Sequence, residues 1–493
     1  MLTLLLFVAV ILLILWKMTS KPKKFPPGPP KWPLVGNAFQ LKSPNLLLHE
    51  VLGAFAEKYG EVTGLYTASQ PLILVSGPDA IREALNKPEL QGRPTSATQK
   101  FEKRNLGIAF IEDDVWKDHR RFSLRHLREL GMGKREMEAI IHDEIRDLMD
   151  EVKRYAGPEY SKPVPVRELV AATGANVIYH MLSGERFSLR DPKLRHLMEI
   201  IRKLIALTDA SGGFASSMLI LLRVLPSLTK YPELKKFRNE LFSFLTEKIE
   251  EHKKKLDEDN PSDFIDMFLV EMNKNDSHPS FHMDQLLQLI YELFIAGSDT
   301  TSGSLSFAFL YMVLYPEVQV KVQKELDDVI GRERLPSLND RAKLRYVEAT
   351  LNEIFRMASV APLAVPHSII NENSDVEFRG YVIPKNSRIV VNLHGLHKDK
   401  KYWGDPEKFR PERFLDSEGN LRKEDALIPF GTGKRSCVGE SLARNNIFLT
   451  FTSFMQNFSM KTPDGDPTPS AEPEGGLILC ARPFRVNMTQ RPL

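Results

Sequence analysis

The hydrophobic and polar positions along the chain follow two different periods. From about residue 116 to about residue 358 the apolar residues recur at i, i+3 and i+4, as in "IIHDEIRDLMDEVKRY", which predicts amphipathic helices. Shorter apolar stretches near the two ends, such as residues 71–76 and residues 375–393, predict strands, and we interpret the final "GGLILCARPFRVNM" as a hairpin. Helices outnumber strands without regular alternation, so the sequence predicts a mainly α fold with smaller β-sheets, of the α+β class.

The longest helical pattern runs from about residue 282 to residue 315, directly before Pro316. A helix of that length spans roughly 50 Å and is expected to pass through the middle of the body. It contains "AGSDTT", residues 296–301. The glycine lowers the stability of a helix by about 1 kcal/mol relative to alanine, and the polar side chains compete for backbone hydrogen bonds. Such a break in an apolar helix often marks a functional position, and a solvent-facing kink is the alternative.

The N-terminus is apolar from Met1 to Trp16, and four lysines and "FPPGPP" follow it. Roughly 20 residues cross a bilayer, and basic residues after the apolar run favour an uncleaved anchor over a cleaved signal peptide. The positive-inside rule then keeps the rest of the chain in the cytosol. We predict an anchor over residues 1–19, a stiff basic and proline-rich hinge over residues 20–30, and a single domain over residues 31–493.

Composition narrows the possible functions. The chain has 493 residues, a net charge of +3 and 27% charged residues, which suits a globular body and gives no sign of nucleic-acid binding. Its two cysteines, Cys437 and Cys480, cannot form a disulfide framework. Cys480 ends the apolar run "GGLILC" and is interpreted as an inert, buried thiol.

Cys437 lies in "FGTGKRSCVG", directly before an apolar-periodic helix and after Lys434 and Arg435. A helix N-terminus and nearby cations are expected to lower the pKa of the thiol and favour thiolate. The glycines of this loop permit tight turns or close approach to a ligand. Four other chemistries need residues that are absent near Cys437. A zinc site needs further ligands, a redox dithiol needs a second cysteine in C-x-x-C, a cysteine nucleophile needs a partner histidine, and phosphate binding needs a complete glycine-rich motif. The remaining chemistry is axial ligation of a heme iron.

The same loop resembles the heme-binding signature of the cytochrome P-450 superfamily, F-x-x-G-x-R-x-C-x-G. Its fixed positions are filled by Phe430, Gly433, Arg435, Cys437 and Gly439. Three further family motifs follow the family order: "AGSDTT" in the long helix, Glu353 and Arg356 in "EIFR", and Arg413 in "FRPERF". With the anchor and the proline hinge, the resemblance spans nearly the whole chain and is closest to the microsomal, reductase-fed class.

The resemblance implies a cytochrome P-450 fold that holds heme b (iron protoporphyrin IX) between the long central helix and the helix after the cysteine loop. It implies that Cys437 is the axial iron ligand and that Phe430 packs beside the loop. It also implies side-chain partners for the two heme propionates: Arg93, Trp116, Arg120, Arg435 and His367. For Arg93 and His367, the alternative is an ordinary polar side chain at the surface.

Two further groups take their roles from the resemblance. Glu353, Arg356 and Arg413 are expected to form a buried, structural charge network. Asp299 and Thr300 are expected to deliver protons for dioxygen cleavage, with a helix irregularity at Gly297 making room for the oxygen. Because the acid and the alcohol are both present, a monooxygenase is favoured over a peroxide isomerase.

Electrons must come from another protein, because the chain has no nicotinamide or flavin fingerprint. The expected partner is NADPH–cytochrome P-450 reductase, with cytochrome b5 as a further partner, at the endoplasmic reticulum membrane. A basic docking face near the cysteine is one interpretation of seven residues, and a generic solvated face is the other. They are Lys117, Arg121, Arg125, Arg128, Lys134, Arg135 and Lys434.

The segments that line the pocket in the family are strongly apolar, which predicts a lipophilic substrate, although many of them could equally be core. They are Leu106–Ile111, Ile205–Leu222, Phe294–Ala296, Val360–Val365 and Leu477. The run "FASSMLILLRVLP" is expected to form a second membrane contact. Among arthropod members, the chain resembles enzymes that epoxidise methyl farnesoate to juvenile hormone. Ecdysteroid or other steroid hydroxylation, xenobiotic oxidation and a non-catalytic heme sensor or carrier are the alternatives.

Overall fold

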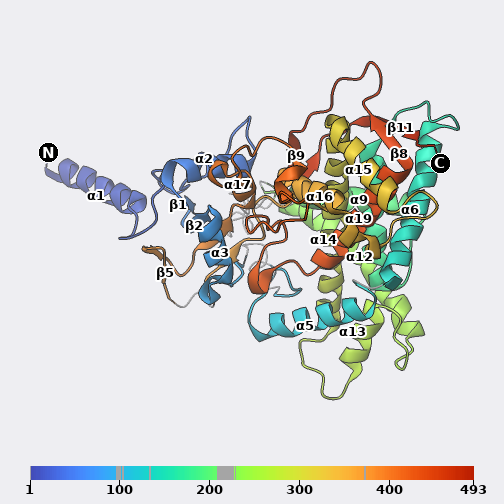
Figure 1. The fold of residues 1–493 in the computed structure, drawn as a ribbon. Coiled ribbons are helices and arrows are strands. Elements are labelled where there is room, and N and C mark those ends of the chain that lie inside the picture. The colour runs from blue at the N-terminus through green and yellow to red at the C-terminus, as the bar shows by residue number, and fades with distance from the viewer. Residues whose placement is uncertain are drawn as a thin grey trace.

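The computed structural model describes residues 2–95, 102, 105–132, 135–207, 227, 229–370 and 374–492. A large helical region forms one end of the molecule, and a smaller region that carries β1, β2, α2 and α3 forms the other end (Figure 1). The observed architecture is therefore mainly α with small β-sheets, and this prediction is confirmed.

The helices account for most of the described structure. The α-helices are α1 (Leu2–Thr19), α2 (Leu48–Tyr59), α3 (Pro78–Asn86), α5 (Asp113–Glu129), α6 (Arg135–Ala156), α7 (Val166–Val170), α8 (Thr173–Ser183), α9 (Pro192–Leu207), α12 (Tyr231–Lys255), α13 (Phe264–Asn273), α14 (Met283–Leu314), α15 (Pro316–Val329), α16 (Arg345–Ala358), α17 (Leu393–His397), α18 (Lys400–Trp403) and α19 (Glu440–Asn457). The 3-10 helices are η1 (Pro88–Leu90), η3 (Leu338–Lys343), η5 (Pro411–Phe414) and η6 (Gly433–Arg435).

The strands form small sheets that join distant parts of the chain. The first sheet has the order β1 (Val62–Thr67), β2 (Gln70–Val75), β7 (Arg388–Val391) and β4 (His367–Ser368), with β2 and β7 parallel. The others are β3 (Val164–Pro165), β11 (Arg485–Gln490) and β8 (Phe458–Lys461); β10 (Leu479–Ala481) with β9 (Pro473–Gly475); and β5 (Val376–Phe378) with β6 (Tyr381–Ile383).

The predicted C-terminal hairpin is wrong. Strand β10 pairs with β9, and β11 pairs with β8 and β3, so the two strands of the proposed hairpin belong to different sheets. Pro483 lies between them, and a proline lacks the N–H that a tight hairpin ladder needs. The chain therefore leaves one sheet at this point and enters another.

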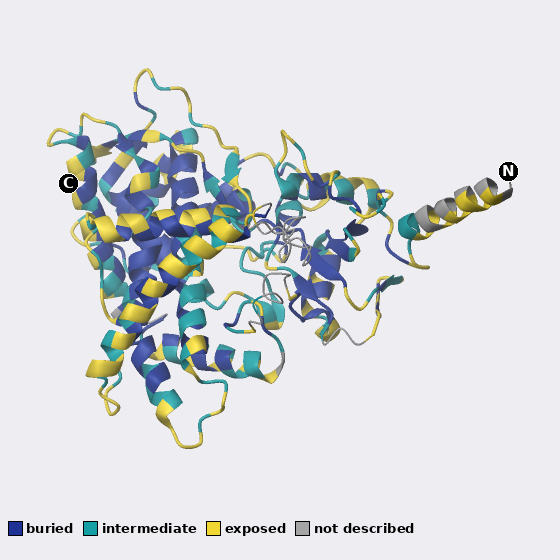
Figure 2. Ribbon diagram, turned by 180° about the vertical axis from the view of Figure 1, so that it is seen from behind, coloured by how far each residue is buried: buried dark blue, intermediate teal, exposed yellow. Residues whose placement is uncertain are grey.

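The predicted central helix is confirmed as α14, a 32-residue helix with His282 as its N-cap. It ends at Leu314 because Pro316 cannot continue the hydrogen-bond ladder. Its C-terminal half is part of the main hydrophobic core, where Leu305, Phe307 and Phe309 are fully or almost fully buried. Buried segments are concentrated in the interior of the large helical region (Figure 2).

The polar patch in α14 does not interrupt the helix, which is assigned as α-helix throughout residues 296–301. The hydroxyl groups of Ser298 and Thr300 donate to the carbonyls one turn earlier, over 2.6 and 2.7 Å. A Cβ on Gly297 would lie 3.1 Å from the side chain of Ile178 on α8. This glycine lets two helices pack closely, and the expected opening for oxygen at Gly297 stays a prediction.

Helix α1 projects from the β-rich end of the molecule (Figure 1). Within the described residues, no single helix passes a test of length and apolarity for crossing a membrane; α14 and α15 pass it only as a pair bent by 107°. The segment after α1 is not a free spacer, because Lys21 Nζ donates to the carbonyl oxygens of Gly28 and Gly64 over 3.1 and 3.3 Å. Phe25 is buried and its ring stacks on Tyr66 at 5.1 Å.

Candidate active site

The cysteine loop is closed by a hydrogen bond from Cys437 N to the carbonyl oxygen of Phe430, over 2.9 Å. Gly431 and Gly433 have φ angles of 70° and 76°, in the left-handed region that favours glycine. A Cβ on Gly433 would lie 2.4 Å from the carbonyl oxygen of Leu85, whereas a Cβ on Gly431 would have no atom within 4 Å. Gly433 is therefore needed where the loop packs against the end of α3.

The thiol of Cys437 precedes α19, which begins at Glu440 with Gly439 as its N-cap. The residue is exposed by surface area, yet burial raises the pKa of its thiol more than the Gly439 N–H and Arg120 lower it. The predicted net lowering of this pKa is therefore wrong for the protein by itself, because desolvation outweighs the helix terminus. A metal cation on the sulfur reverses this balance, since a coordinating thiol is deprotonated outright.

Arginine side chains from distant segments surround the loop. Arg120, on α5, donates from Nη2 to the carbonyl oxygen of Ser436 over 2.8 Å, directly beside Cys437. Arg435 stacks on the ring of Trp116, with its Cζ atom 3.7 Å from the ring centroid. It also donates to the carbonyl oxygens of Gln91 and Ile111, over 3.0 and 2.9 Å. The loop and the start of α5 are thus fixed to each other by guanidinium groups.

Arg93 and His367 complete this basic cluster. Burial, and then Arg435 and Arg120, lower the pKa of Arg93 to about 9. Its Nη1 donates to the carbonyl oxygens of Val365 and Pro366, both over 2.9 Å, while its buried Nε has no hydrogen-bond partner among the described residues. His367 lies 3.0 Å from the carbonyl oxygen of Leu90, and burial followed by Arg93 and Arg435 holds its pKa well below the usual range.

This cluster fits a bound heme. Arg435 and Arg120 both disfavour the positive charge of Arg93, and the buried Nε of Arg93 has no partner among the described residues, so the cluster favours the binding of anions. The two carboxylates of heme b supply such anions, and guanidinium groups bind carboxylates through paired N–H donors. Cys437 lies beside the same cluster, one residue from the Arg120 contact at Ser436.

Phe430 lies beside the loop as predicted. Its ring meets Phe355 of α16 edge-on at 5.7 Å, and the guanidinium of Arg444, on α19, lies 4.7 Å from the Phe430 ring centroid. The loop is thereby packed against two helices.

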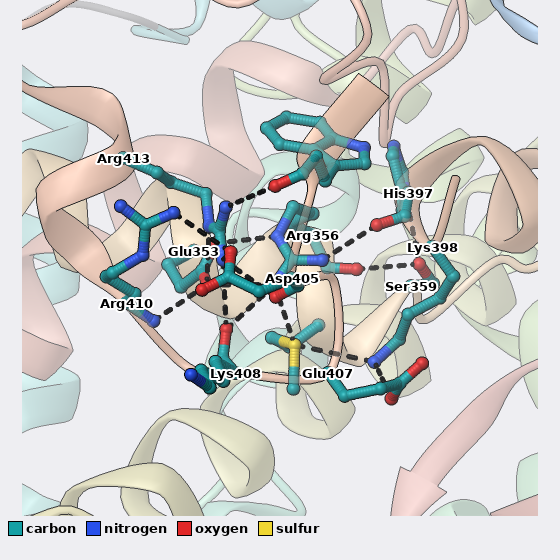
Figure 3. A network of polar contacts seen from close by, with 12 residues as sticks. Glu353, Arg356, Ser359, His397, Lys398, Asp405, Glu407, Lys408, Arg410 and Arg413 are labelled. Atoms are coloured by element: carbon teal, nitrogen blue, oxygen red, sulfur yellow. Dashed lines mark hydrogen bonds and ion pairs between the residues drawn. The ribbon is translucent and has the colours of Figure 1, made fainter. Parts of the chain in front are cut away.

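Behind the loop, Glu353, Arg356 and Arg413 meet in one buried ion network (Figure 3). Glu353 accepts two bonds from Arg356, over 2.7 and 2.8 Å, and one from Arg413 Nε over 3.0 Å. Glu353 and Arg356 are completely buried. Arg356 also donates to the carbonyl oxygen of His397, and Arg413 to the carboxylate of Asp405, over 2.8 and 3.1 Å.

His397 connects this network to the cysteine loop, and the sequence reasoning missed it. Its Nε2 accepts from the N–H of Ile428 over 3.3 Å, so its Nδ1 carries the proton toward Ser359 Oγ, 2.8 Å away. Ser359 Oγ donates in turn to the carbonyl oxygen of Arg356 over 2.9 Å. Burial, and then Arg356 and Lys398, lower the pKa of His397 to about 3, so the ring is neutral. No short motif marks this histidine, because its partners lie far away in the sequence.

Asp299 and Thr300 leave α14 in different directions, since consecutive helical residues point about 100° apart. Asp299 lines a cavity of about 230 Å³ together with Arg167, Arg202, Glu474 and Cys480. Burial raises the pKa of Asp299, and Arg202 and Arg167 partly offset this. Thr300 does not line this cavity, and its hydroxyl donates a hydrogen bond to the carbonyl oxygen of Ala296.

A profile of the cytochrome P450 family matches residues 26–488. The chain belongs to the cytochrome P450 family. It is 36% identical to the farnesoate epoxidase of Bombyx mori, over 94% of this chain and 93% of that protein. It is 38% identical to cytochrome P450 2B9 of Mus musculus, over 90% of each chain, and 37% identical to cytochrome P450 2B4 of Oryctolagus cuniculus, over 97% of each. The protein is thus an oxidoreductase that uses heme b, dioxygen and NADPH-derived electrons from a reductase.

One predicted wall of the P450 pocket, Leu106–Ile111, is tied to α14. Glu292 Oε2 accepts from the N–H groups of Ile108 and Ala109, over 2.7 and 2.9 Å, and burial raises the pKa of Glu292. Gln285 exchanges two hydrogen bonds with the backbone of Gly107, over 2.9 and 3.0 Å. Sequence reasoning missed both side chains, although a carboxylate and an amide inside an apolar helix are a visible signal.

The other predicted wall segments divide between cavity and core. Ile205 lines the cavity beside Asp299, whereas residues 208–222 lie outside the described residues, as does the run "FASSMLILLRVLP". Phe294 and Leu363 are buried in hydrophobic clusters, Val365 is exposed, and Leu477 packs against the cluster that contains Leu363.

The predicted basic face of the P450 is largely neutralised along α5. Lys117 pairs with Asp114 at 2.8 Å, Arg121 with Asp118 at 3.9 Å, and Arg125 with Glu129 at 3.0 Å. Lys434 is exposed, while Lys134 and the side chain of Arg135 lie outside the described residues. Burial raises the pKa of Cys480 to about 12, so this second thiol stays protonated.

Proposed function

We propose that this P450 is a monooxygenase of a neutral, lipophilic substrate, with methyl farnesoate as the best candidate and its epoxide, juvenile hormone, as the product. The observation that carries the substrate is the likeness to a farnesoate epoxidase at 36% identity over almost the whole chain. The two hydrogen bonds that Glu292 accepts from the N–H groups of Ile108 and Ala109, here called the Glu292 clamp, support a neutral substrate. They already occupy this carboxylate, so it does not bind a cationic group of the substrate.

In this proposal Cys437 would hold the heme iron, and Arg93, Trp116, Arg120, His367 and Arg435 would bind the propionates. Heme held by a thiolate supplies the electron density that favours O–O cleavage. The partnerless Nε of Arg93 and the stacking of Arg435 on Trp116 support these roles.

Asp299 and Thr300 supply protons in this proposal. The Thr300 hydroxyl donates to Ala296, so its oxygen lone pairs remain available to accept from a water molecule. Burial shifts the Asp299 carboxyl toward its protonated form, and the cavity beside it provides room for water. A carboxyl whose pKa is raised in this way can both hold a proton and release it.

Helix α1 anchors the P450 in the endoplasmic reticulum membrane, with the catalytic domain in the cytosol. The support is the exposure of apolar side chains on this helix, such as Leu6, Leu13 and Trp16, which are all more than 60% exposed. The reductase, and cytochrome b5 as a second donor, approach from the side of the cysteine loop, where Lys434 is exposed.

The test is reconstitution with reductase, NADPH and lipid, followed by mass spectrometry of incubations with methyl farnesoate, ecdysteroids and typical xenobiotics. Gain of one oxygen atom on methyl farnesoate supports the proposal. Oxidation of xenobiotics only would favour the second candidate, which the likeness to the 2B proteins supports. Heme binding without turnover of any substrate would favour a sensor or carrier.

The ligand is tested separately with Cys437→Ser, and Cys480→Ser is the matched control. The first change is expected to abolish the red-shifted carbonyl–heme Soret band, and the second to leave it unchanged. Persistence of the band in Cys437→Ser would show that another residue holds the iron.

A further inference from the structure

One histidine and two aspartates meet where α12 ends and α13 begins. Among the residues that the structure describes, His252, Asp263 and Asp266 are the one group of three metal-ligating side chains whose ligand atoms all lie within 4.8 Å of one another. His252 lies in the last turn of α12, Asp263 is the N-cap of α13, and Asp266 lies in the first turn of α13. None of them lines the cavity beside Asp299, and the P450 chemistry proposed above does not use them.

Each aspartate uses one carboxylate oxygen to hold the backbone and leaves the other oxygen for the cluster. Asp263 Oδ1 accepts from the N–H of Asp266 over 3.0 Å, which caps α13. Asp266 Oδ2 accepts from the N–H and the hydroxyl of Ser262, over 3.2 and 2.8 Å. The other two oxygens, Asp263 Oδ2 and Asp266 Oδ1, lie 3.6 and 3.1 Å from His252 Nδ1. Hydrogen bonds of this kind orient the carboxylates of metal sites.

A single histidine proton cannot satisfy both of these oxygens. Asp266 Oδ1 is at hydrogen-bond distance from His252 Nδ1, whereas Asp263 Oδ2 has no hydrogen-bond partner among the described residues. The Asp263 side chain is only 2% exposed, and burial raises its pKa to about 6. A buried carboxylate oxygen without a partner costs free energy, and a cation at this point would remove that cost.

The spacing of the three ligand atoms fits a tetrahedral cation. Bonds of about 2.0–2.1 Å from zinc to nitrogen and oxygen place neighbouring ligand atoms roughly 3.3 Å apart. The measured distances from His252 Nδ1, 3.6 and 3.1 Å, lie on either side of this value. Three protein ligands leave a fourth position for water. One imidazole with two carboxylates suits zinc better than calcium or magnesium, because those two ions prefer oxygen ligands.

The carboxyl end of α8 lies beside the same oxygen. Gly184 is the C-cap of α8, and a Cβ on this residue would lie 3.3 Å from Asp263 Oδ2. A helix C-terminus carries roughly half a negative charge, which favours a cation nearby. A side chain at position 184 would crowd Asp263 Oδ2, and glycine leaves this space open.

We propose that His252, Asp263 and Asp266 bind a divalent, zinc-like cation through Nδ1, Oδ2 and Oδ1. The cation satisfies both carboxylates, where a histidine N–H satisfies only one. It joins the end of α12 to the start of α13, beside the end of α8, and it stabilises the folded protein by mass action. The site is structural and does not depend on the proposed substrate.

The test adds zinc ion alone to the heme-loaded full chain after treatment with a chelator. Isothermal titration calorimetry measures the affinity and the stoichiometry, and circular dichroism measures the midpoint of thermal unfolding. His252→Gln and Asp263→Asn each remove one ligand. His196→Gln is the matched control, because His196 pairs with a single carboxylate, that of Glu240, at 2.6 Å and is 57% exposed.

We expect the parent protein and His196→Gln to bind one zinc ion per chain and to unfold at a higher temperature with zinc. In His252→Gln and Asp263→Asn the affinity should fall about tenfold or more, and zinc should no longer raise the midpoint. Equal affinity in all four proteins, or no saturable binding by the parent, would overturn the proposal and leave an ion pair between a histidine and two carboxylates.

X-ray absorption at the zinc edge of the parent protein gives a readout that does not depend on how the variants fold. The heme iron absorbs at a different energy and does not obscure this edge. Nitrogen and oxygen ligands at about 2.0–2.1 Å would support the site. Sulfur ligands would place the zinc on a cysteine and overturn it.

Discussion

Glu353→Gln is the sharpest test of the buried network. Glu353 Oε1 accepts from Arg356 Nη2, Arg413 Nε and the Arg410 N–H over 2.8, 3.0 and 2.8 Å, and Oε2 accepts from Arg356 Nε over 2.7 Å. Glutamine keeps the size of the side chain. It replaces one acceptor oxygen with an NH₂ group that faces other donors, and it leaves two buried guanidinium groups without their shared anion.

Removing one partner of a buried ion network costs about 3–5 kcal/mol. The entropy of unfolding is about 2.1 cal/mol/K per residue, which for this chain gives roughly 1 kcal/mol/K. The midpoint of thermal unfolding should therefore fall by about 3–5 °C, and the heme content should fall with it, because His397 links the network to the cysteine loop.

The assay follows far-ultraviolet circular dichroism and Soret absorbance during heating. Glu199→Gln is the control, since its partner Lys203 is 2.6 Å away and both side chains are about half exposed. Surface pairs contribute little to stability, so this variant should unfold like the parent protein. If Glu353→Gln keeps its heme and unfolds no earlier than Glu199→Gln, the reasoning about the network is refuted.

Three further variants test other parts of the structure. Burial raises the pKa of Asp263 to about 6, so its stabilising contribution is present below about pH 4 and is lost as pH rises through 6. Asp263→Asn, which keeps the N-cap, should raise the unfolding midpoint at about pH 8 but not at about pH 4; a lower midpoint at the higher pH would contradict this. Glu292→Ala should raise KM for the substrate about tenfold or more by releasing Ile108 and Ala109, while Glu292→Gln should retain most of the affinity; equal kinetics would exclude the clamp. Gly433→Ala should lower heme retention more than Gly431→Ala, since both are left-handed but only Gly433 is crowded by Leu85; equal retention of heme would refute the packing argument.

Local signals predicted much of the helical fold. The central helix α14 was bounded to within about a residue at each end, because Pro316 prevents its continuation and the apolar period is long and regular. The resemblance to a family brought Glu353, Arg356 and Arg413 together, and the structure places them in one network. These features depend on short motifs or on a single helix.

Features that depend on distant partners could not be predicted. The pairing of β10 with β9 and the role of His397 each need contacts between segments far apart in the chain. The close contact of Gly297 with Ile178 requires knowing which helix crosses α14. The raised pKa of Cys437 reflects burial in the folded protein, which a sequence pattern of cations and glycines does not contain.

The parallel pairing of β2 with β7 has a consequence for the order of biosynthesis. Leu72 and Arg388 pair directly, and Arg93, Arg120 and Arg435 come from the early and late parts of the chain. A nascent chain therefore contains Arg93 and Arg120 long before Cys437 is synthesised, and contacts of such long sequence separation form slowly. Cofactor uptake by these residues thus follows synthesis of nearly the whole chain.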